Sequence, residues 1–409
     1  MSDAAMNRLS RRQLLLRSGV AVVAIGASPT LLAACGGGDD AATNAGGGDA
    51  GTMVEEASAA LADGSGEVGG AIDYLSWEGY DTPDAIKSWV DGNGVEINAT
   101  YIATHDDIQA KILAADGGTG YDIITYYQGY KPLYQELDIL QGLDPEKIPN
   151  LGGLYPYFQG DAGNFWVNAD GVRTGVPWTF GGIGVTWNDK EISGGITSWY
   201  DFLDAKFKGK VAVVDDPTGN AALGSHILGL QPDKLNRDTD VPKLKDFFTQ
   251  LLAQTKGVSA SFGDATNLLV SGESTICFNG WSAINSFAAD AGNNDIKTGF
   301  PQEGGYGFCD AFAIPTTADN AATAYSWINN ILDPKVNAAA SDFLVAATPV
   351  EAAVPLLGET TRALYPYDDI DAFLEKIPFY NNPPLESDEY MTIGEWMEIW
   401  TELKANAGS

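Results

Sequence analysis

One carboxylate stands in the middle of an apolar stretch of the sequence. The segment Phe308–Ile314 is mostly apolar, follows glycines and ends before Pro315, which predicts a β-strand. Side chains two positions apart in a strand point to the same face, so Phe308 and Asp310 share a face. A buried carboxylate needs hydrogen-bond donors or a cation. Asp310 therefore either accepts bonds from neighbouring backbone amides or faces a cationic ligand together with Phe308.

Two adjacent acids, Asp215 and Asp216, end another apolar run, which begins at Lys210. A helix is predicted directly after it, from Thr218 to Leu228. Aspartate at this position often caps a helix and compensates its dipole, so capping is the simpler interpretation. A ligand contact is the alternative.

The first part of the folded chain alternates between strand and helix patterns. The predicted elements are a strand at 71–77, a helix from Pro83 to Gly92 capped by Thr82, a strand at 95–102, a helix at 105–115, a strand at 121–127 and a helix at 131–137. Such alternation predicts parallel strands joined by right-handed crossovers. Ligands of open α/β sheets bind beyond the carboxyl ends of the strands. Aromatic residues occupy those ends, namely Trp77, Tyr80, Tyr126, Tyr127 and, after the strand 274–278, Trp281.

The second part of the chain also mixes predicted strands and helices. An extended run covers 175–187, and helices are predicted near 199–203, 241–251, 264–271, 318–331, 335–345 and 392–405. Phe343 and the stripe of Trp396, Ile399, Trp400 and Leu403 are expected to pack in the core. Cys277 and Cys309 lie in apolar runs, where two buried thiols are favoured over a disulfide.

The N-terminus carries an export signal. Four arginines up to Arg17 precede a short apolar run that is too short to span a membrane and that leads to Cys35. Ser10–Leu15 resembles a twin-arginine motif, and Leu32–Cys35 resembles a lipobox in which Cys35 becomes the lipidated first residue. An uncleaved anchor is the alternative. Residues 36–69, rich in Gly, Ala and acids, are expected to form a flexible tether.

Composition narrows the class of protein. The 23 basic and 55 acidic residues give a net charge of −32, which becomes −35 without residues 1–34 and their four Arg and one Asp. Such a surface disfavours nucleic acid and attracts cations, although acidity also serves solubility. The length of the remainder favours two lobes. No catalytic nucleophile, metal-ligand spacing or cofactor loop is evident, so we expect no enzyme, metal or cofactor.

These motifs together resemble a known family. From about residue 71 to 405, the chain is similar to bacterial extracellular solute-binding proteins of the spermidine/putrescine class, which feed ABC importers. The segments that carry the similarity are 75–80, 120–124, 175–178, 197–202, 207–211, 214–216, 272–273, 303–305, 310–315 and 348–349. Each is short, and their order and spacing across the chain make the set specific.

The resemblance implies an α/β fold of the type II periplasmic-binding-protein kind. Two lobes, each a mostly parallel sheet flanked by helices, are then joined by crossover strands near Val176–Trp178 and Gly307–Asp310. Lobe 1 is expected at 70–176 plus 310–345, and lobe 2 at 177–309 plus 346–409. The implied ligand site lies between them, lined by Trp77, Tyr80, Phe308, Asp310 as the ammonium-binding carboxylate and Asp216 as a second one.

The chain also departs from the family pattern in places that bear on the ligand. Gly219 stands where the family often has a further acid, for which Glu78 is a substitute candidate. The family's tryptophan near position 279 is displaced to Trp281, and a site tyrosine is missing near Ala346. Tyr126, Tyr127 and Gln128 remain alternatives in the loop after Ile124.

The resulting hypothesis is an exported, lipid-anchored binding protein on the periplasmic or cell-surface side. It is expected to act as a monomer, to bind a polyamine or related cationic amine, and to deliver it to an ABC permease. One alternative is a binding protein of the same fold for a quaternary amine, an opine-like compound or a metal complex. Others are a surface hydrolase that uses Asp216 and Asp310 as acid and base, and an adhesive lipoprotein without a small ligand.

Overall fold

The computed structural model describes residues 61–102, 108, 111, 120–160, 165–168 and 170–407. The expected export signal, the first part of the tether and most of the expected helix at 105–115 lie outside the described residues. No helix within these ranges is long and apolar enough to cross a membrane.

A single sheet of nine strands organises the described chain. The strands are β1 (Gly70–Trp77), β2 (Val95–Ile102), β3 (Ile123–Tyr127), β4 (Val176–Asn188), β5 (Val211–Val214), β6 (Thr255–Ser259), β7 (Ile276–Trp281), β8 (Ile296–Gly299) and β9 (Tyr306–Ala313). Their order is β2-β1-β3-β9-β4-β7-β5-β6, with β8 paired to β4. The predicted parallel pairing is confirmed for β1 with β2 and for β1 with β3.

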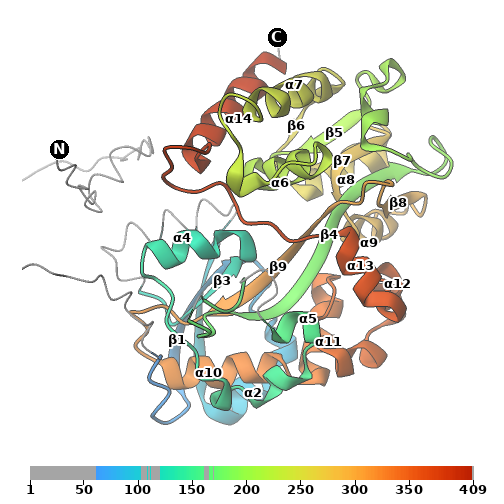
Figure 1. Cartoon of the computed structure of the whole chain (residues 1–409). Helices are drawn as coiled ribbons and strands as arrows, with labels where there is room; N and C mark the ends of the chain where they lie inside the picture. The colour runs from blue at the N-terminus through green and yellow to red at the C-terminus, as the bar shows by residue number, and fades with distance from the viewer. Residues whose placement is uncertain are drawn as a thin grey trace, which may run out of the picture. The chain divides into compact units, whose positions relative to one another are not determined.

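The neighbouring strands β4 and β9 connect the two halves of the sheet. They pair antiparallel from Val176↔Phe312 to Ile183↔Tyr306. Figure 1 shows them running from the part of the sheet near α10 toward β8 and α8. Glycines in β4 permit close contacts with the neighbouring strands: a Cβ at Gly184 would lie 2.4 Å from the carbonyl oxygen of Gly299 in β8, which also pairs with β4. The extended run predicted at 175–187 is therefore a real strand whose glycines have a packing reason.

Helices cover both halves of the sheet. They are α2 (Pro83–Asn93), α4 (Lys131–Glu136), α5 (Pro156–Gln159), α6 (Pro217–Ile227), α7 (Val241–Leu252), α8 (Phe262–Ser271), α9 (Ala283–Asp290), α10 (Ala321–Ile331), α11 (Pro334–Leu344), α12 (Glu359–Leu364), α13 (Ile370–Lys376) and α14 (Ile393–Ala407). Short 3-10 helices lie at Gln128–Tyr130, Pro145–Lys147, Pro149–Gly153, Trp199–Leu203, Ala205–Phe207, Pro232–Lys234, Glu351–Leu356 and Tyr367–Asp369. The α10 helix packs on β1, whereas α14 packs on α6, α7 and β6.

Several details differ from the sequence prediction. The α2 helix ends at Asn93 rather than Gly92, because Gly94 adopts the left-handed conformation that ends it. The segment at Trp199–Leu203 forms a 3-10 helix, and the predicted core residue Phe343 is 60% exposed. The edge strand β6 and the four-residue β8 were not predicted, since β6 is largely polar and exposed and lacks an apolar alternation.

Other expectations are confirmed. Gly272 ends α8 in the left-handed conformation, and Trp396, Trp400 and Leu403 of α14 are buried. Cys277 and Cys309 are both buried and not bonded to each other, as expected for two core thiols.

The segment before β1, which the sequence assigned to the tether, lies against the folded chain from residue 61 onward. The backbone amide of Ala62 donates to the carbonyl of Gly142 at 2.9 Å, and Ala62 is buried. At Gly69 the amide donates to the Thr323 hydroxyl at 3.0 Å, and the Asn320 amide donates to the Gly69 carbonyl. These bonds attach the segment to the start of α10.

One buried carboxylate, directly before β3, joins this strand to β1 and to the beginning of α10. Asp122 accepts backbone hydrogen bonds from Asp73, Asp319 and Asn320 at 2.9, 2.9 and 2.7 Å. Three amides at the junction of strand and helix thus depend on a single side chain.

We expect Asp122→Ala to lower the free energy of unfolding by about 2–4 kcal/mol, because it leaves these amides without an acceptor. Urea denaturation monitored by tryptophan fluorescence measures the change. Asp91→Ala is the control, since Asp91 forms an exposed i,i+4 pair with Lys87 and should cost roughly 0.5 kcal/mol or less. Equal losses for the two variants would contradict the structural role given to Asp122.

Candidate functional site

Among the charged residues of the described strands, Asp310 is the one that is buried. It lies in β9 and is only 4% exposed. The Tyr80 hydroxyl donates a hydrogen bond to its Oδ2 at 2.7 Å. Burial raises the pKa of Asp310 to about 6, although the bond from Tyr80 acts in the opposite direction. Within the described residues Asp310 takes part in no ion pair, so its charge has no internal counter-ion there.

A tight turn after β1 brings Tyr80 to this carboxylate. The amide of Tyr80 donates to the carbonyl of Trp77, and the amide of Thr82 donates to that of Gly79. Gly79 and Thr82 both have positive φ, at 86° and 39°, which is uncommon for a β-branched residue such as threonine. The Tyr80 ring then stands edge-on to Trp178 with ring centroids 5.0 Å apart. The backbone of this turn therefore sets the direction of the tyrosine.

The predicted capping role of Thr82 is corrected by the structure. Thr82 does precede the first residue of α2, but its backbone is left-handed, with φ 39° and ψ 57°, rather than extended. Its hydroxyl forms no capping bond and is buried without a hydrogen-bond partner among the described residues. Sequence patterns locate the helix start but do not report this backbone conformation.

Phe308 lies on the same face of β9 as Asp310, because the two residues are two positions apart. It is half-buried, and its ring meets Trp281, the last residue of β7, edge-on at 5.8 Å. The backbone below is Gly181, where a Cβ would lie 2.6 Å from the Phe308 ring. The structure thus brings Phe308 and Trp281 together over the glycine run of β4.

The register between β3 and β9 separates the two candidate tyrosines. Tyr127 pairs with Asp310 and therefore shares its face, whereas Tyr126 pairs with Ala311 and points to the other face. There Tyr126 packs edge-on against Tyr134 at 5.7 Å. Burial raises the pKa of the Tyr127 hydroxyl well above its ordinary value, and the charges of Asp216 and Asp310 add to this. Tyr127 therefore lies within electrostatic reach of both carboxylates.

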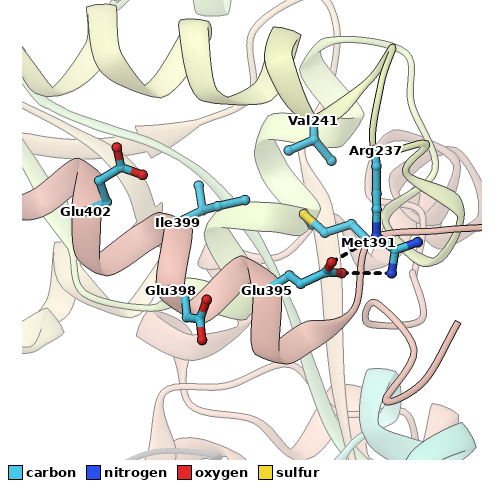
Figure 2. A pocket seen from close by; sticks show the side chains of 7 residues that line it. All are labelled: Arg237, Val241, Met391, Glu395, Glu398, Ile399 and Glu402. Atoms are coloured by element: carbon cyan, nitrogen blue, oxygen red, sulfur yellow. Dashed lines mark hydrogen bonds and ion pairs between the residues drawn. The ribbon is translucent and has the colours of Figure 1, made fainter. Parts of the chain in front are cut away.

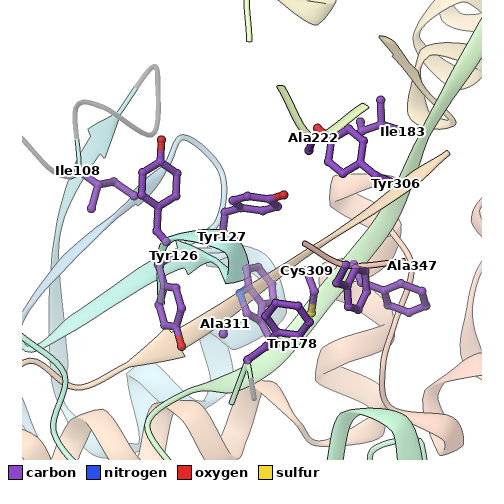
Figure 3. Close-up of a cluster of buried hydrophobic side chains, with 14 of the residues drawn as sticks. Ile108, Tyr126, Tyr127, Trp178, Ile183, Ala222, Tyr306, Cys309, Ala311 and Ala347 are labelled. Carbon is purple, nitrogen blue, oxygen red and sulfur yellow. The ribbon is translucent and has the colours of Figure 1, made fainter. Parts of the chain in front are cut away.

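Gln128, the third candidate in that loop, has a structural role. Its amide nitrogen donates to the carbonyl of Gly307 at 3.2 Å, and its oxygen accepts from the amide of Cys309 at 2.7 Å. These bonds tie the end of β3 to the backbone of β9. Figure 3 shows the buried surroundings, with Tyr127, Trp178, Tyr306 and Cys309 drawn among them.

Asp216 is the N-cap of α6, as the simpler interpretation predicted. Its Oδ1 accepts from the amide of Gly219 at 3.0 Å and lies 3.4 Å from the Thr218 hydroxyl. The Tyr306 hydroxyl and Oδ2 of Asp216 both approach Gly219, at 2.3 and 2.0 Å from the position that a Cβ would take there, and the charge of Asp216 adds to the raised pKa of Tyr306. The neighbouring Asp215 turns elsewhere and pairs with Lys404 at 2.6 Å and with the Trp400 indole at 2.8 Å. Only Asp216 of the two is thus directed toward β9.

The remaining predicted residues lie at the end of β1. Trp77 is its last residue and is half-buried. Glu78 is exposed in the turn that follows. Among the described residues, the exposed carboxylate of Glu78 makes no hydrogen bond or ion pair to the buried residues around Asp310.

Two further tyrosines escaped the sequence analysis, Tyr306 beside Asp216 and Tyr380, whose charge acts on Tyr127. Tyr306 lies two positions before Phe308 in β9, so the same strand alternation could have identified it. Tyr380 comes from the irregular segment after α13, where no local pattern marks it. Its hydroxyl meets Nδ1 of His226 at 2.8 Å, while Nε2 of His226 donates to the carbonyl of Glu303 at 2.7 Å. Burial lowers the pKa of His226, which favours the neutral ring.

A separate hollow of about 340 Å³ lies on the surface near α14 and holds none of these residues. Figure 2 shows the ion pair between Arg237 and Glu395 at its edge, with a nitrogen–oxygen distance of 2.8 Å. Its other lining residues are Val241, Met391, Glu398, Ile399 and Glu402. The acidic helix face and the open position distinguish it from the aromatic surroundings of Asp310.

Comparison with known proteins gives one consistent result. A family model described as bacterial extracellular solute-binding protein matches residues 84–363. The chain is 25% identical over 354 residues to the putrescine-binding periplasmic protein SpuD of Pseudomonas aeruginosa, covering 82% of this chain and 92% of that protein. It is 24% identical over 324 residues to the spermidine/putrescine-binding periplasmic protein of Escherichia coli, covering 78% and 88%.

A solved structure confirms the predicted fold class. The spermidine/putrescine ABC transporter substrate-binding protein PotD from Streptococcus pneumoniae aligns with a TM-score of 0.66 at 20% identity. The alignment covers 82% of this chain and 99% of that structure. The fold is thus the α/β architecture of type II periplasmic binding proteins.

We expect Asp310→Asn to stabilise the ligand-free protein at pH 7 by about 1–3 kcal/mol. The folded-state pKa of about 6 exceeds the ordinary value of 3.8, so the ionised carboxylate disfavours the folded state. This penalty is complete above pH 6 and disappears as the pH falls toward 4, because the folded protein then takes up the proton.

Thermal or urea unfolding of both proteins between pH 4 and 7.5 measures the effect. The advantage of the variant should shrink as the pH decreases. A difference that does not vary with pH would show that the carboxylate is not destabilised by burial.

Proposed function

This chain belongs to the bacterial extracellular solute-binding proteins, and we propose that it captures a polyamine or a related cationic amine for an ABC importer. The relatives that it matches are named for putrescine or spermidine binding. They are solute-binding proteins, and we propose a binding role without catalysis for this chain as well. The proposed site comprises Asp310, Asp216, Tyr80, Tyr127 and the aromatic pair of Phe308 and Trp281.

The observation that carries the proposal is the buried charge of Asp310. Its hydrogen-bond donor among the described residues is the hydroxyl of Tyr80. A hydroxyl satisfies one acceptor position but supplies no positive charge. An ammonium group supplies both the charge and three donors, and a charge-assisted bond of this kind is about twice as strong as a neutral one. A cationic ligand would therefore compensate the cost of burying this carboxylate.

The aromatic side chains support the same chemistry. An ammonium over the face of Trp, Tyr or Phe gains about 0.5–2 kcal/mol, more where water is excluded. Tyr80 donates to Asp310, Phe308 lies on the same face of β9 and meets Trp281, and the charges of Asp216 and Asp310 both act on Tyr127. We propose that these rings bind the methylene chain and the cationic ends of an amine.

Asp216 is proposed as the second negative group. Its capping bond to Gly219 occupies one oxygen but leaves the carboxylate charge in place. Through Tyr127, the charge of Asp216 acts on the same buried region as that of Asp310. These electrostatic contacts support a ligand that lies between Asp310 in β9 and Asp216 at the start of α6.

We further propose that the lobes predicted from the sequence close on the ligand. The paired strands β4 and β9 are the connection about which such closure would take place. The lobe limits remain 70–176 plus 310–345 and 177–309 plus 346–409. Export through the N-terminal signal, lipidation at Cys35, action as a monomer and delivery to a permease complete the proposal.

We expect Asp310→Asn to weaken binding of the best amine ligand by about 2–5 kcal/mol, because it removes a buried charge partner while preserving the side-chain shape. Titration calorimetry with putrescine, cadaverine and spermidine gives the affinities. Betaines and amino acids in the same panel test the alternative ligand classes.

Asp91→Asn is the matched control, because Asp91 lies in an exposed pair on α2. Its affinity should equal that of the unmodified protein. Unchanged affinity in Asp310→Asn would remove Asp310 from the site, and the absence of any amine binding would contradict the proposed function.

A further inference from the structure

The space around Gly219 is filled by two oxygen atoms from other residues. A Cβ at Gly219 would lie 2.0 Å from Oδ2 of Asp216 and 2.3 Å from the hydroxyl oxygen of Tyr306. Contacts this short would force the end of at least one of these two side chains to move, so the two oxygen atoms together fill the space beside Gly219. Because position 219 is a glycine, the tyrosine hydroxyl and the carboxylate can both reach this point.

Tyr306 occupies the same face of β9 as Phe308 and Asp310 and is 3% exposed. Tyr306 and Asp310 are four positions apart in the strand, which corresponds to about 13 Å between their Cα atoms. Burial raises the pKa of the Tyr306 hydroxyl, and the neighbouring charge of Asp216 adds to this. The hydroxyl is therefore neutral and available as a donor to Asp216.

The two acids of the proposed site thus differ in what they offer to a ligand. Asp310 accepts a bond from the Tyr80 hydroxyl. Asp216 already accepts the Gly219 amide through Oδ1, and the Tyr306 hydroxyl lies beside Oδ2. An ammonium group that binds Asp216 directly would have to displace Tyr306 from a buried position.

Building on the proposed function, we propose that Tyr306 is a specificity-determining residue that closes the Asp216 end of the site and selects short amines over long ones. A diamine such as putrescine places one ammonium at Asp310 and ends before the tyrosine. The additional aminopropyl arm of spermidine would meet the Tyr306 ring and the occupied carboxylate. The ligand class is therefore a short alkyl amine or diamine.

Calorimetry with putrescine, cadaverine and spermidine on the full mature protein tests this assignment. The unmodified protein should bind the diamines at least roughly tenfold more tightly than spermidine, as expected when a pocket excludes additional groups. Tyr306→Ala should reduce this ratio by roughly tenfold or more, mainly by improving spermidine. Tyr306→Phe should preserve the preference, because the ring still fills the end of the site.

Tyr200→Ala is the matched control, since Tyr200 is a half-exposed tyrosine on the 3-10 helix Trp199–Leu203. It should leave the ratio unchanged. Tyr306→Leu, which retains apolar volume, provides the measurement if the alanine variant unfolds.

The outcomes are distinguishable. If the unmodified protein binds amines but does not prefer the short ones, or if both Tyr306→Ala and Tyr306→Leu keep the preference, the role of Tyr306 is refuted and the proposed function survives. If no amine binds, the proposed function fails and this inference fails with it.

Discussion

Burial of one carboxylate is the constraint on which the proposed site depends. Asp310 sits in a central strand, almost fully removed from water, with the hydroxyl of Tyr80 as its donor. That arrangement is costly for an ionised acid, as its raised pKa shows. The turn after β1, with its left-handed Thr82, holds the tyrosine in place. Strain and an uncompensated charge thus coincide at one location, which is typical of a functional site.

The neighbouring acids Asp215 and Asp216 show how position decides the role of a carboxylate. Asp215 turns to Lys404 and Trp400 and so joins α14 to the end of β5. Asp216, one residue later, caps α6 and reaches Tyr306 on β9. Capping leaves the charge of Asp216 in place. This charge can still attract the proposed cationic ligand, although the Gly219 amide and the Tyr306 hydroxyl lie at the two oxygens of the carboxylate. The two interpretations of Asp216 therefore do not exclude each other.

Much of the fold follows from local patterns in the sequence. The strands at β1, β2 and β9 and the glycine that ends α8 were predictable, because alternation and backbone preference are properties of short segments. The edge strand β6 was not, since a polar and exposed strand lacks an apolar face. The irregular segment between α13 and α14 showed no local pattern either. There Tyr380 approaches His226 through a contact that spans 154 positions.

The sequence alone determined that Phe308 and Asp310 share a face, because the two-residue period of a strand needs no other information. It also marked Gly219 as a departure from the family pattern. Only the tertiary structure decided that Tyr127 rather than Tyr126 lies on the same face of the sheet as Asp310, because this depends on the register between β3 and β9. It likewise placed Tyr80 on a carboxylate 230 positions away and the Tyr306 hydroxyl over Gly219. Contacts between distant segments are set by packing of the whole sheet, and no local period encodes them.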